Sequence, residues 1–283
     1  MSDRNEKAKR VLDNSTKVVA IIGVVAILFA VWFSIKFAKS KTKQEFDNRQ
    51  TYFNDIHQHF NKDWANNAYW DSVGTENSVY NSAEESIQYL IRKETFNDQF
   101  NVKTSTTARP DLYKVLNASI LKKDTSNNHY QVQLATLCMN PLVLHKMTVS
   151  AQNTWGITHK SYFNLKSVIT LKYDSYKDKE GIDSKVLPKD VLFEDQLPIC
   201  LRALNFKDST NFNVKVLESQ ITNGVGALKI YNASVSMNSE SDNTFNVTVK
   251  LDDQNTYNYY FEKSFPNKLL KFYKNKVLFA KAF

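Results

Sequence analysis

Arg202 is the charged residue of an otherwise apolar stretch, LPICLRAL, over residues 197–204. A guanidinium group is seldom buried without a carboxylate or carbonyl partner. Glu194, Asp195 or a carboxylate from across a sheet could be that partner. Two roles stay open: Arg202 contacts the headgroup of a ligand, or it forms a structural ion pair that fixes a helix to a sheet. The structural pair is favoured, because ion pairs commonly do this without a further function.

The other candidate ligand or partner contacts are apolar or aromatic. Leu197 and Leu201 lie in the same stretch, and Tyr257, Tyr259 and Phe261 alternate in a later segment. Side chains two residues apart share one face of a strand, so the three aromatic rings could line a pocket for an apolar ligand. They could also form the core of a curved sheet, which is favoured because large aromatic side chains are mostly buried.

Residue patterns for metal binding and catalysis are weak. His57 and His59 would point about 200° apart on a helix and could not bind one ion together. His129, His145 and His159 lack the spacing of metal ligands. The sequence has no G-x-S-x-G, P-loop or H-E-x-x-H motif, and it contains six glycines in all. We therefore expect a protein without catalytic residues, metal or cofactor. An unrecognised hydrolase is kept as a third hypothesis, after the two that are given at the end of this subsection.

Cys138 and Cys200 are the two cysteines of the chain. Their number and spacing match neither a disulfide framework nor a zinc motif. In an exported domain they could form one disulfide, which would stabilise the fold by a few kcal/mol. Two buried thiols are slightly favoured, because both cysteines lie in apolar runs.

An apolar segment near the N-terminus predicts a membrane anchor. Residues 18–35 carry no charge, and about 20 apolar residues cross a bilayer as a helix. A signal peptide has a shorter apolar region that ends in a small-x-small site, whereas this segment ends in bulky aromatic residues. We therefore predict a retained transmembrane helix over residues 18–38, after a cytoplasmic tail over residues 1–17.

Most of the net positive charge of the chain lies in the residues on both sides of this segment. The chain has a net charge of +8, with 37 Lys and Arg residues against 29 Asp and Glu residues. Residues 1–43 hold nine of the basic and three of the acidic residues, which leaves 28 and 26 for the rest. Membrane headgroups are the natural partner of these flanks, and no nucleic-acid partner is expected. The N-terminal side has slightly more basic residues, which favours an N-terminus inside, although the opposite topology stays open.

The remaining chain divides by its hydrophobic period. Residues 39–125 are predicted to form a helical stalk and a loop region, with an amphipathic helix over residues 44–66 and a second helix after the capping-box pattern of Ser82–Glu85. Alternating residues from 126 to 283 predict antiparallel strands, one of them long, over residues 161–173. Two short apolar helices are predicted within residues 188–204. After residue 211, turn residues predict a meander.

These elements predict an α+β fold. A transmembrane helix and a helical stalk precede a curved antiparallel β-sheet meander, a clam-like half-barrel. The short helical insert is expected to fill the concave side of the sheet, since its apolar face must be covered.

Two segments resemble a known family. Residues 171–217, which include LPICLRAL, and residues 258–274, NYYFEKSFPNKLLKFYK, are similar to bacterial envelope proteins of the DUF3108 family. The resemblance covers residues 130–283 and implies a fold like the half-open β-clam of lipoprotein carriers. An uncleaved anchor here takes the place of the lipobox or cleaved signal of that family.

The resemblance and the anchor together lead to a functional expectation. The chain is expected to be a single-pass protein of the bacterial inner (cytoplasmic) membrane, with its main domain periplasmic or extracellular. That domain would bind a lipid or another hydrophobic ligand, or an envelope protein partner. The alternative is a structural scaffold subunit of a multi-protein envelope or secretion assembly, which would self-associate through residues 44–100.

Overall fold

The computed structural model describes residues 23–37, 51–97, 102–103, 112–165, 168–176, 185–206, 210–224 and 228–281. The chain divides into two units, residues 1–46 and residues 47–283. The first unit contains a helix over residues 23–37, all of them exposed. This helix lies inside the predicted span 18–38, whose other residues, like the tail 1–17, are outside the described residues. No described helix combines the length and the apolar character that crossing a membrane requires.

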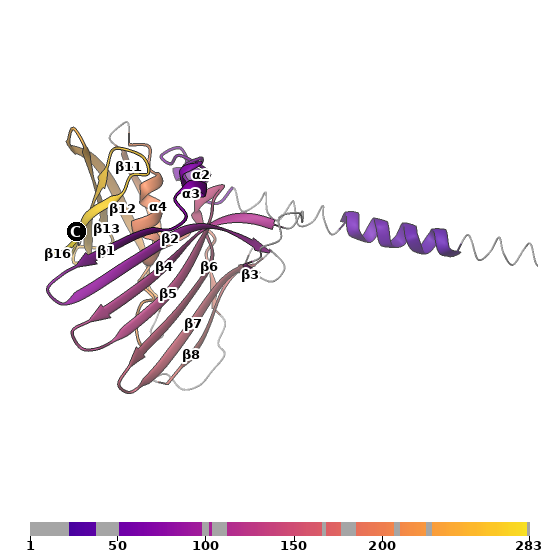
Figure 1. Ribbon diagram of the computed structural model, residues 1–283, viewed down its shortest axis with the longest axis horizontal. Helices are drawn as coiled ribbons and strands as arrows, with labels where there is room; N and C mark the ends of the chain where they lie inside the picture. Colours follow the sequence, from indigo (N-terminus) through magenta and orange to yellow (C-terminus); the bar gives the residue numbers. More distant parts are fainter. Residues whose placement is uncertain are drawn as a thin grey trace, which may run out of the picture. The chain divides into compact units, whose positions relative to one another are not determined.

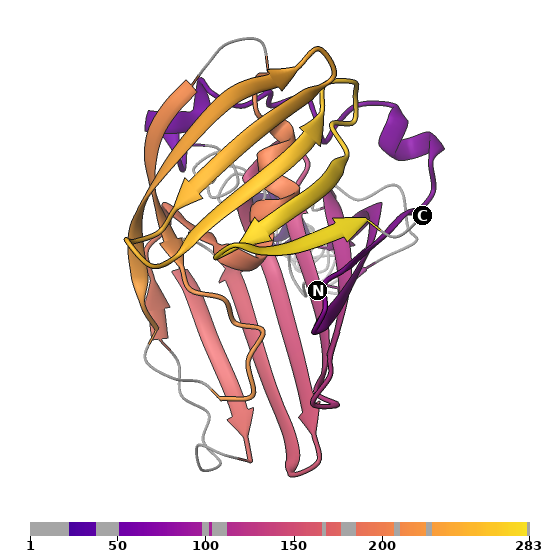
Figure 2. The ribbon, with the colours of Figure 1, turned by 90° about the vertical axis from the view of Figure 1, so that its left-hand side faces the viewer.

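The second unit is a single sheet of sixteen strands with a few short helices (Figures 1 and 2). Its helical elements are α2 (Asn54–His57), α3 (Tyr69–Ser72), η1 (Glu194–Gln196), α4 (Leu197–Cys200) and η2 (Leu201–Ala203). The strands of its N-terminal half are β1 (Glu76–Asn81), β2 (Glu85–Asn97), β3 (Val102–Lys103), β4 (Leu112–Asp124), β5 (His129–Leu137), β6 (Asn140–Asn153), β7 (Gly156–Leu165), β8 (Val168–Ser175) and β9 (Lys185–Leu187). Those of its C-terminal half are β10 (Val191–Phe193), β11 (Thr210–Leu217), β12 (Ile230–Ser241), β13 (Thr244–Lys250), β14 (Thr256–Glu262), β15 (Leu269–Lys274) and β16 (Val277–Lys281).

The two halves are joined where the first strand meets the last. The strand β1 pairs with β2 on one side and with β16 on the other, both antiparallel. The described neighbours along the sheet are antiparallel except β10 and β11, which are parallel. The sheet runs from β10 through β16, β1 and β2 to β9, and it curves until it nearly closes around α4 (Figure 2).

The alternation of buried and more exposed residues explains why the C-terminal half forms strands. Along β13, the side chains of Phe245, Val247 and Val249 are buried while their neighbours are half-buried or exposed. Such alternation is typical of an antiparallel sheet with one solvated face. The turns predicted near residues 238–243, 252–255, 265–267 and 274–275 lie between successive strands from β12 to β16. The predicted meander after residue 211 is therefore confirmed.

The helical insert is confirmed in place but differs in form. Residues 194–203 make one continuous segment of η1, α4 and η2 rather than two helices, with Pro198 in the first turn of α4. Val191 and Leu192, which were predicted to be helical, lie in β10. A three-residue strand is too short to show its period in the sequence. The insert lies on the concave side of the sheet, where Leu197, Cys200 and Leu201 are 0% exposed (Figure 2).

The predicted helical stalk is wrong where the chain is described. Residues 51–72 contain only the four-residue helices α2 and α3, and the sheet begins at Glu76 rather than near residue 126. The Ser82–Glu85 pattern closes a hairpin: Ser82 Oγ accepts hydrogen bonds from the backbone N–H groups of Glu84 (3.3 Å) and Glu85 (2.9 Å). The same capping geometry serves a turn as well as a helix, and the alternation that follows is that of a strand.

The predicted long strand over residues 161–173 is also wrong. It is the hairpin of β7 and β8, in which Tyr162 pairs with Leu171. Both strands continue the same alternation, and neither glycine nor proline marks the reversal between them.

The two cysteines are free and buried, so no disulfide joins Cys138 to Cys200. Burial raises the pKa of each thiol to about 12. Both are therefore protonated at neutral pH and behave as small apolar core side chains.

Candidate functional site

Arg202 is buried where the insert meets β1 and the turn between β14 and β15. Its Nη1 and Nη2 donate to Glu76 Oε1 at 2.8 Å and to Glu76 Oε2 at 3.0 Å. Its Nε donates to the backbone oxygens of Pro266 at 3.3 Å and Asn267 at 3.1 Å. The carboxylate partner therefore comes from across the sheet, and neither Glu194 nor Asp195 provides it.

Two tryptophan rings complete the surroundings of Arg202. The guanidinium carbon lies 5.4 Å from the ring centroid of Trp64 and 5.3 Å from that of Trp70. Burial alone would raise the pKa of Glu76, but the charge and hydrogen bonds of Arg202 outweigh it and hold this pKa below its ordinary value. The contacts of Arg202 thus connect the insert, β1, α3 and the β14–β15 turn, which is the work of a structural ion pair.

The structure brings the other five predicted contacts together around α4. Leu197, Leu201 and Phe261 are 0% exposed, Tyr257 is 4% exposed and Tyr259 is 2% exposed. The three aromatic rings stack along β14 with centroids 6.0 Å and 6.1 Å apart. These side chains pack the insert against the C-terminal half, and Tyr257 donates its hydroxyl proton to Glu194 Oε1.

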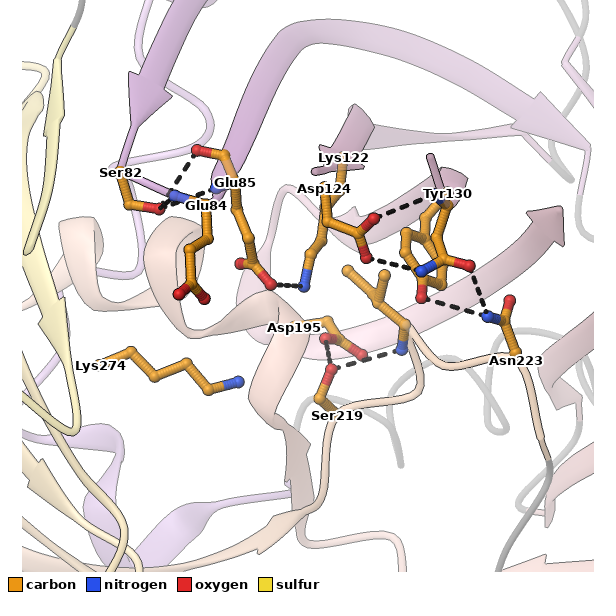
Figure 3. A network of polar contacts seen from close by, with 12 residues as sticks. Ser82, Glu84, Glu85, Lys122, Asp124, Tyr130, Asp195, Ser219, Asn223 and Lys274 are labelled. Carbon is orange, nitrogen blue, oxygen red and sulfur yellow. Dashed lines mark hydrogen bonds and ion pairs between the residues drawn. The ribbon is translucent and has the colours of Figure 1, made fainter. Parts of the chain in front are cut away.

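A network of polar side chains lies beside this core, where hairpin tips of the N-terminal half face the chain that follows β11 (Figure 3). We call it the mouth and define it by Glu85, Ile87, Lys122, Asp124, Asn128, Tyr130, Asp195, Ser219, Asn223 and Lys274. Strand pairing explains why its members meet: Ile87 pairs with Lys122, and Lys122 pairs with Tyr130, so the three side chains share the concave face. Ile87 and Tyr130 are half-buried, unlike the core residues behind them.

Charged and amide groups hold the rim of the mouth. Lys122 Nζ lies 2.8 Å from Glu85 Oε1, and their side chains are 18% and 27% exposed. Asp124 accepts hydrogen bonds from the backbone and side-chain nitrogens of Asn128 at 3.0 Å and 2.8 Å. The side-chain nitrogen of Asn223 donates to Asn128 at 3.2 Å and to the Tyr130 hydroxyl at 3.4 Å. The side-chain oxygen of Asn223, Oδ1, is buried and has no hydrogen-bond partner among the described residues.

One wall of the mouth is a loop, residues 218–224, seated on the inner face of β7. Lys160 is 0% exposed, and its Nζ donates to the Gln220 backbone oxygen at 3.0 Å and to Thr222 Oγ1 at 2.8 Å. The hydroxyl of Tyr162 donates to Gln220 Oε1. Thr158 Oγ1 donates to the Asn223 backbone oxygen at 2.7 Å. The loop therefore covers the concave face through polar contacts rather than apolar packing.

Asp195 ties the same loop to the insert. Its Oδ1 accepts a hydrogen bond from Ser219 Oγ at 2.6 Å, and its Oδ2 accepts one from the Gln220 backbone N–H at 2.7 Å. Burial, together with the charge of Glu194, raises the pKa of Asp195 from 3.8 to about 6. The carboxylate is thus costly to bury in its charged form at neutral pH.

Replacing Asp195 with Asn should remove this pH dependence. The raised pKa means that the folded state binds the Asp195 proton more tightly than the unfolded state, so the contribution is present at low pH and is lost as pH rises from about 4 through about 6. The difference in unfolding free energy between Asp195→Asn and the native chain should therefore shift in favour of the variant, by up to about 3 kcal/mol, as pH rises across this window. Urea unfolding at several pH values measures it, with exposed Asp190→Asn as the control. A difference that does not change with pH would contradict the raised pKa.

Sequence reasoning missed most of the mouth. In β5, Tyr130 alternates with its neighbours so that it shares one face with Val132 and Leu134, a pattern visible in the sequence, and this face is the concave one. Nothing in the sequence connected that face with residues 218–224, which lie about 90 positions later and have no regular period. Charged residues at inward strand positions, Glu85 and Lys122, were the available signal.

The described residues hold no group of three or more His, Cys, Asp and Glu side chains that could bind a metal ion. His145 is buried and meets the Tyr113 ring edge to face, with ring centroids 4.6 Å apart. His57 belongs to α2, and His59 stacks on Phe212. Comparison with family models, with curated proteins and with solved structures finds no match.

Proposed function

We propose that this protein is a single-pass, membrane-anchored envelope protein whose clam-like domain binds a hydrophobic ligand at the mouth and catalyses no reaction. A lipid with one apolar chain and a hydrogen-bonding headgroup fits the chemistry of the mouth. The resemblance of residues 130–283 to the DUF3108 family supports the same class of function. The proposal takes the anchor to be residues 18–38 and the domain to lie outside the cytoplasm.

The observation that carries the proposal is the mixture of charged and apolar side chains at the mouth. Lys122 and Glu85 form an ion pair, and half-buried Ile87 and Tyr130 lie on either side of Lys122 on the same inner face. Ligand sites commonly combine an apolar lining with a few polar groups that fix orientation. Asn223 Oδ1, a buried acceptor without a partner among the described residues, would accept a hydrogen bond from the headgroup.

A charge introduced on the inner face should weaken binding. Ile87→Glu places a carboxylate where the apolar chain would lie, so we expect the affinity for a fluorescent fatty-acid probe to fall at least about tenfold, or about 1.4 kcal/mol. Leu121→Glu is the matched control, because Leu121 lies on the neighbouring strand, faces outward and is 39% exposed. Probe titration of the full-length protein measures both. Equal affinities for the two variants, or no binding by the native chain, would contradict the proposal.

The proposed topology has its own test. A single cysteine engineered at exposed Ser126, with Cys138 and Cys200 replaced, should react with a membrane-impermeant thiol reagent in spheroplasts. Labelling that requires lysis would place the domain in the cytoplasm and overturn the localisation.

The second candidate function is a scaffold subunit of an envelope or secretion assembly. It is favoured by an exposed apolar tip at the β6–β7 turn, where Trp155 is 82% exposed and Ile157 is 56% exposed. Such side chains commonly mark contacts with other proteins. Cross-linking in membranes should trap oligomers that Trp155→Ser removes, and the absence of any cross-linked species would count against the scaffold.

A further inference from the structure

A hollow on the convex face of the C-terminal half lies on the opposite side of the sheet from the mouth. It has a volume of about 530 Å³ and lies over β14, β15 and the turns at their ends. Its lining includes three amide side chains, Gln254, Asn258 and Asn275, and two aromatic ones, Tyr260 and Tyr273. The two tyrosine rings meet edge to face, with centroids 5.9 Å apart.

The chemistry of the lining narrows the class of ligand. Amide groups both donate and accept hydrogen bonds, so they can bind hydroxyl groups in either direction. Asp253 and Lys276 contribute one charge of each sign, which gives no preference for an anion or a cation. The tyrosine rings offer apolar area to the C–H groups of a ligand that is otherwise polar. A neutral compound with many hydroxyl groups satisfies all three conditions.

Two features fix the shape of the hollow. Thr248 Oγ1 donates to Asn258 Oδ1 at 2.8 Å, which holds the plane of the Asn258 amide. Asn275 and Lys276 both have left-handed backbones, with φ of 47° and 75°. Glycine is the usual residue at the second position of such a hairpin turn, because a side chain there strains the backbone. Here the second position is Lys276, and this residue lines the hollow.

A second hollow, of about 450 Å³, lies on the other side of Tyr260 and is lined in part by Thr244, Leu270 and Lys281. Tyr260 lines both hollows. From Thr256 to Tyr260 alone the strand extends about 14 Å, at about 3.4 Å per residue. The surface is therefore long enough for a chain of several units.

An extended peptide is a poorer fit. Peptides that lie along a sheet obtain affinity from main-chain hydrogen bonds at a strand edge. The strand β14 is paired with β13 on one side and with β15 on the other. It has no free edge, so recognition must come from side chains alone.

From these observations we propose that the convex face over β14 and β15 binds a neutral oligosaccharide. Asn258 and Gln254 would bind its hydroxyl groups, and Tyr273 would stack on a sugar ring. The inference does not depend on the ligand of the mouth.

The test uses the full-length protein in a detergent without a sugar headgroup, titrated by calorimetry with chitotetraose and with maltotetraose. At least one should bind saturably, with a Kd below about 1 mM. Asn258→Ala and Tyr273→Ala should each weaken binding at least about tenfold. Asn211→Ala, which removes an exposed amide outside both hollows, should leave the Kd unchanged.

Lys276→Gly separates a binding role from a structural one. Relief of the left-handed strain should raise the unfolding midpoint, while loss of the side chain should weaken sugar binding. If Asn258→Ala does not fold, Asn258→Asp keeps the shape of the side chain and removes its donors. The proposal is overturned if neither sugar saturates, if the Asn258 and Tyr273 variants bind as the native chain does, or if an uncharged peptide binds here and the sugars do not.

Discussion

Arg202→Met should lower the free energy of unfolding by about 3–5 kcal/mol, because it leaves the Glu76 carboxylate buried without its partner. The Glu76 side chain is only 9% exposed and makes two hydrogen bonds to the guanidinium group. The variant also frees the Pro266 and Asn267 carbonyls from their Arg202 donor and removes the cation from the two tryptophan rings. Urea unfolding measures the loss.

The matched control for this prediction is an exposed ion pair. Lys215 Nζ lies 2.7 Å from Asp190 Oδ2, with side chains 46% and 51% exposed. Lys215→Met should therefore cost no more than about 1 kcal/mol. The double variant Glu76→Leu, Arg202→Met should recover part of the loss, because no charge is then buried alone. A loss below about 1 kcal/mol for Arg202→Met would show that the pair does not hold the insert in place.

Phe261→Ala should cost about 3–5 kcal/mol in the ligand-free protein. Phe261 is 0% exposed, and its ring lies 5.8 Å from that of Phe206 and 6.1 Å from that of Tyr259. Truncation leaves a cavity between the insert and β14 that the surrounding sheet cannot fill. Thermal and urea unfolding measure the loss.

Phe163→Ala provides the control for the core prediction. Phe163 is half-buried on the convex face of β7, so its truncation should cost much less. If the two variants were equally stable, Phe261 would not be a core residue, and its role as a ligand contact would gain support.

Local signals in the sequence predicted the C-terminal half of the fold well. Alternation and turn residues located β12 to β16, and the apolar stretch 197–204 located the buried insert. The same reasoning failed for residues 76–124, because the Ser82–Glu85 turn uses the chemistry of a helix cap. The sequence could not predict that β1 pairs with β16, because this pairing joins Tyr80 to Lys281 and depends on tertiary structure alone.

The candidate site, like the fold, could be predicted from the sequence only in part. An arginine in an apolar helix predicted a buried partner, and the structure supplies Glu76, which lies 126 positions earlier in the chain. The aromatic residues of β14 were recognised as one face and form part of the core. The mouth depends on a loop without period and on contacts between distant segments, so only the inward position of Tyr130 could be read from the sequence.

The central claim is that a hydrophobic ligand binds on the concave face at the mouth. Photo-cross-linking of the full-length protein with a diazirine fatty acid, followed by peptide mass spectrometry, tests it most directly. Attachment to the β2, β4 and β5 segments that carry Ile87, Lys122 and Tyr130, reduced by excess unlabelled fatty acid, is the predicted result. Attachment confined to the convex face, or labelling that excess fatty acid does not reduce, would contradict the claim.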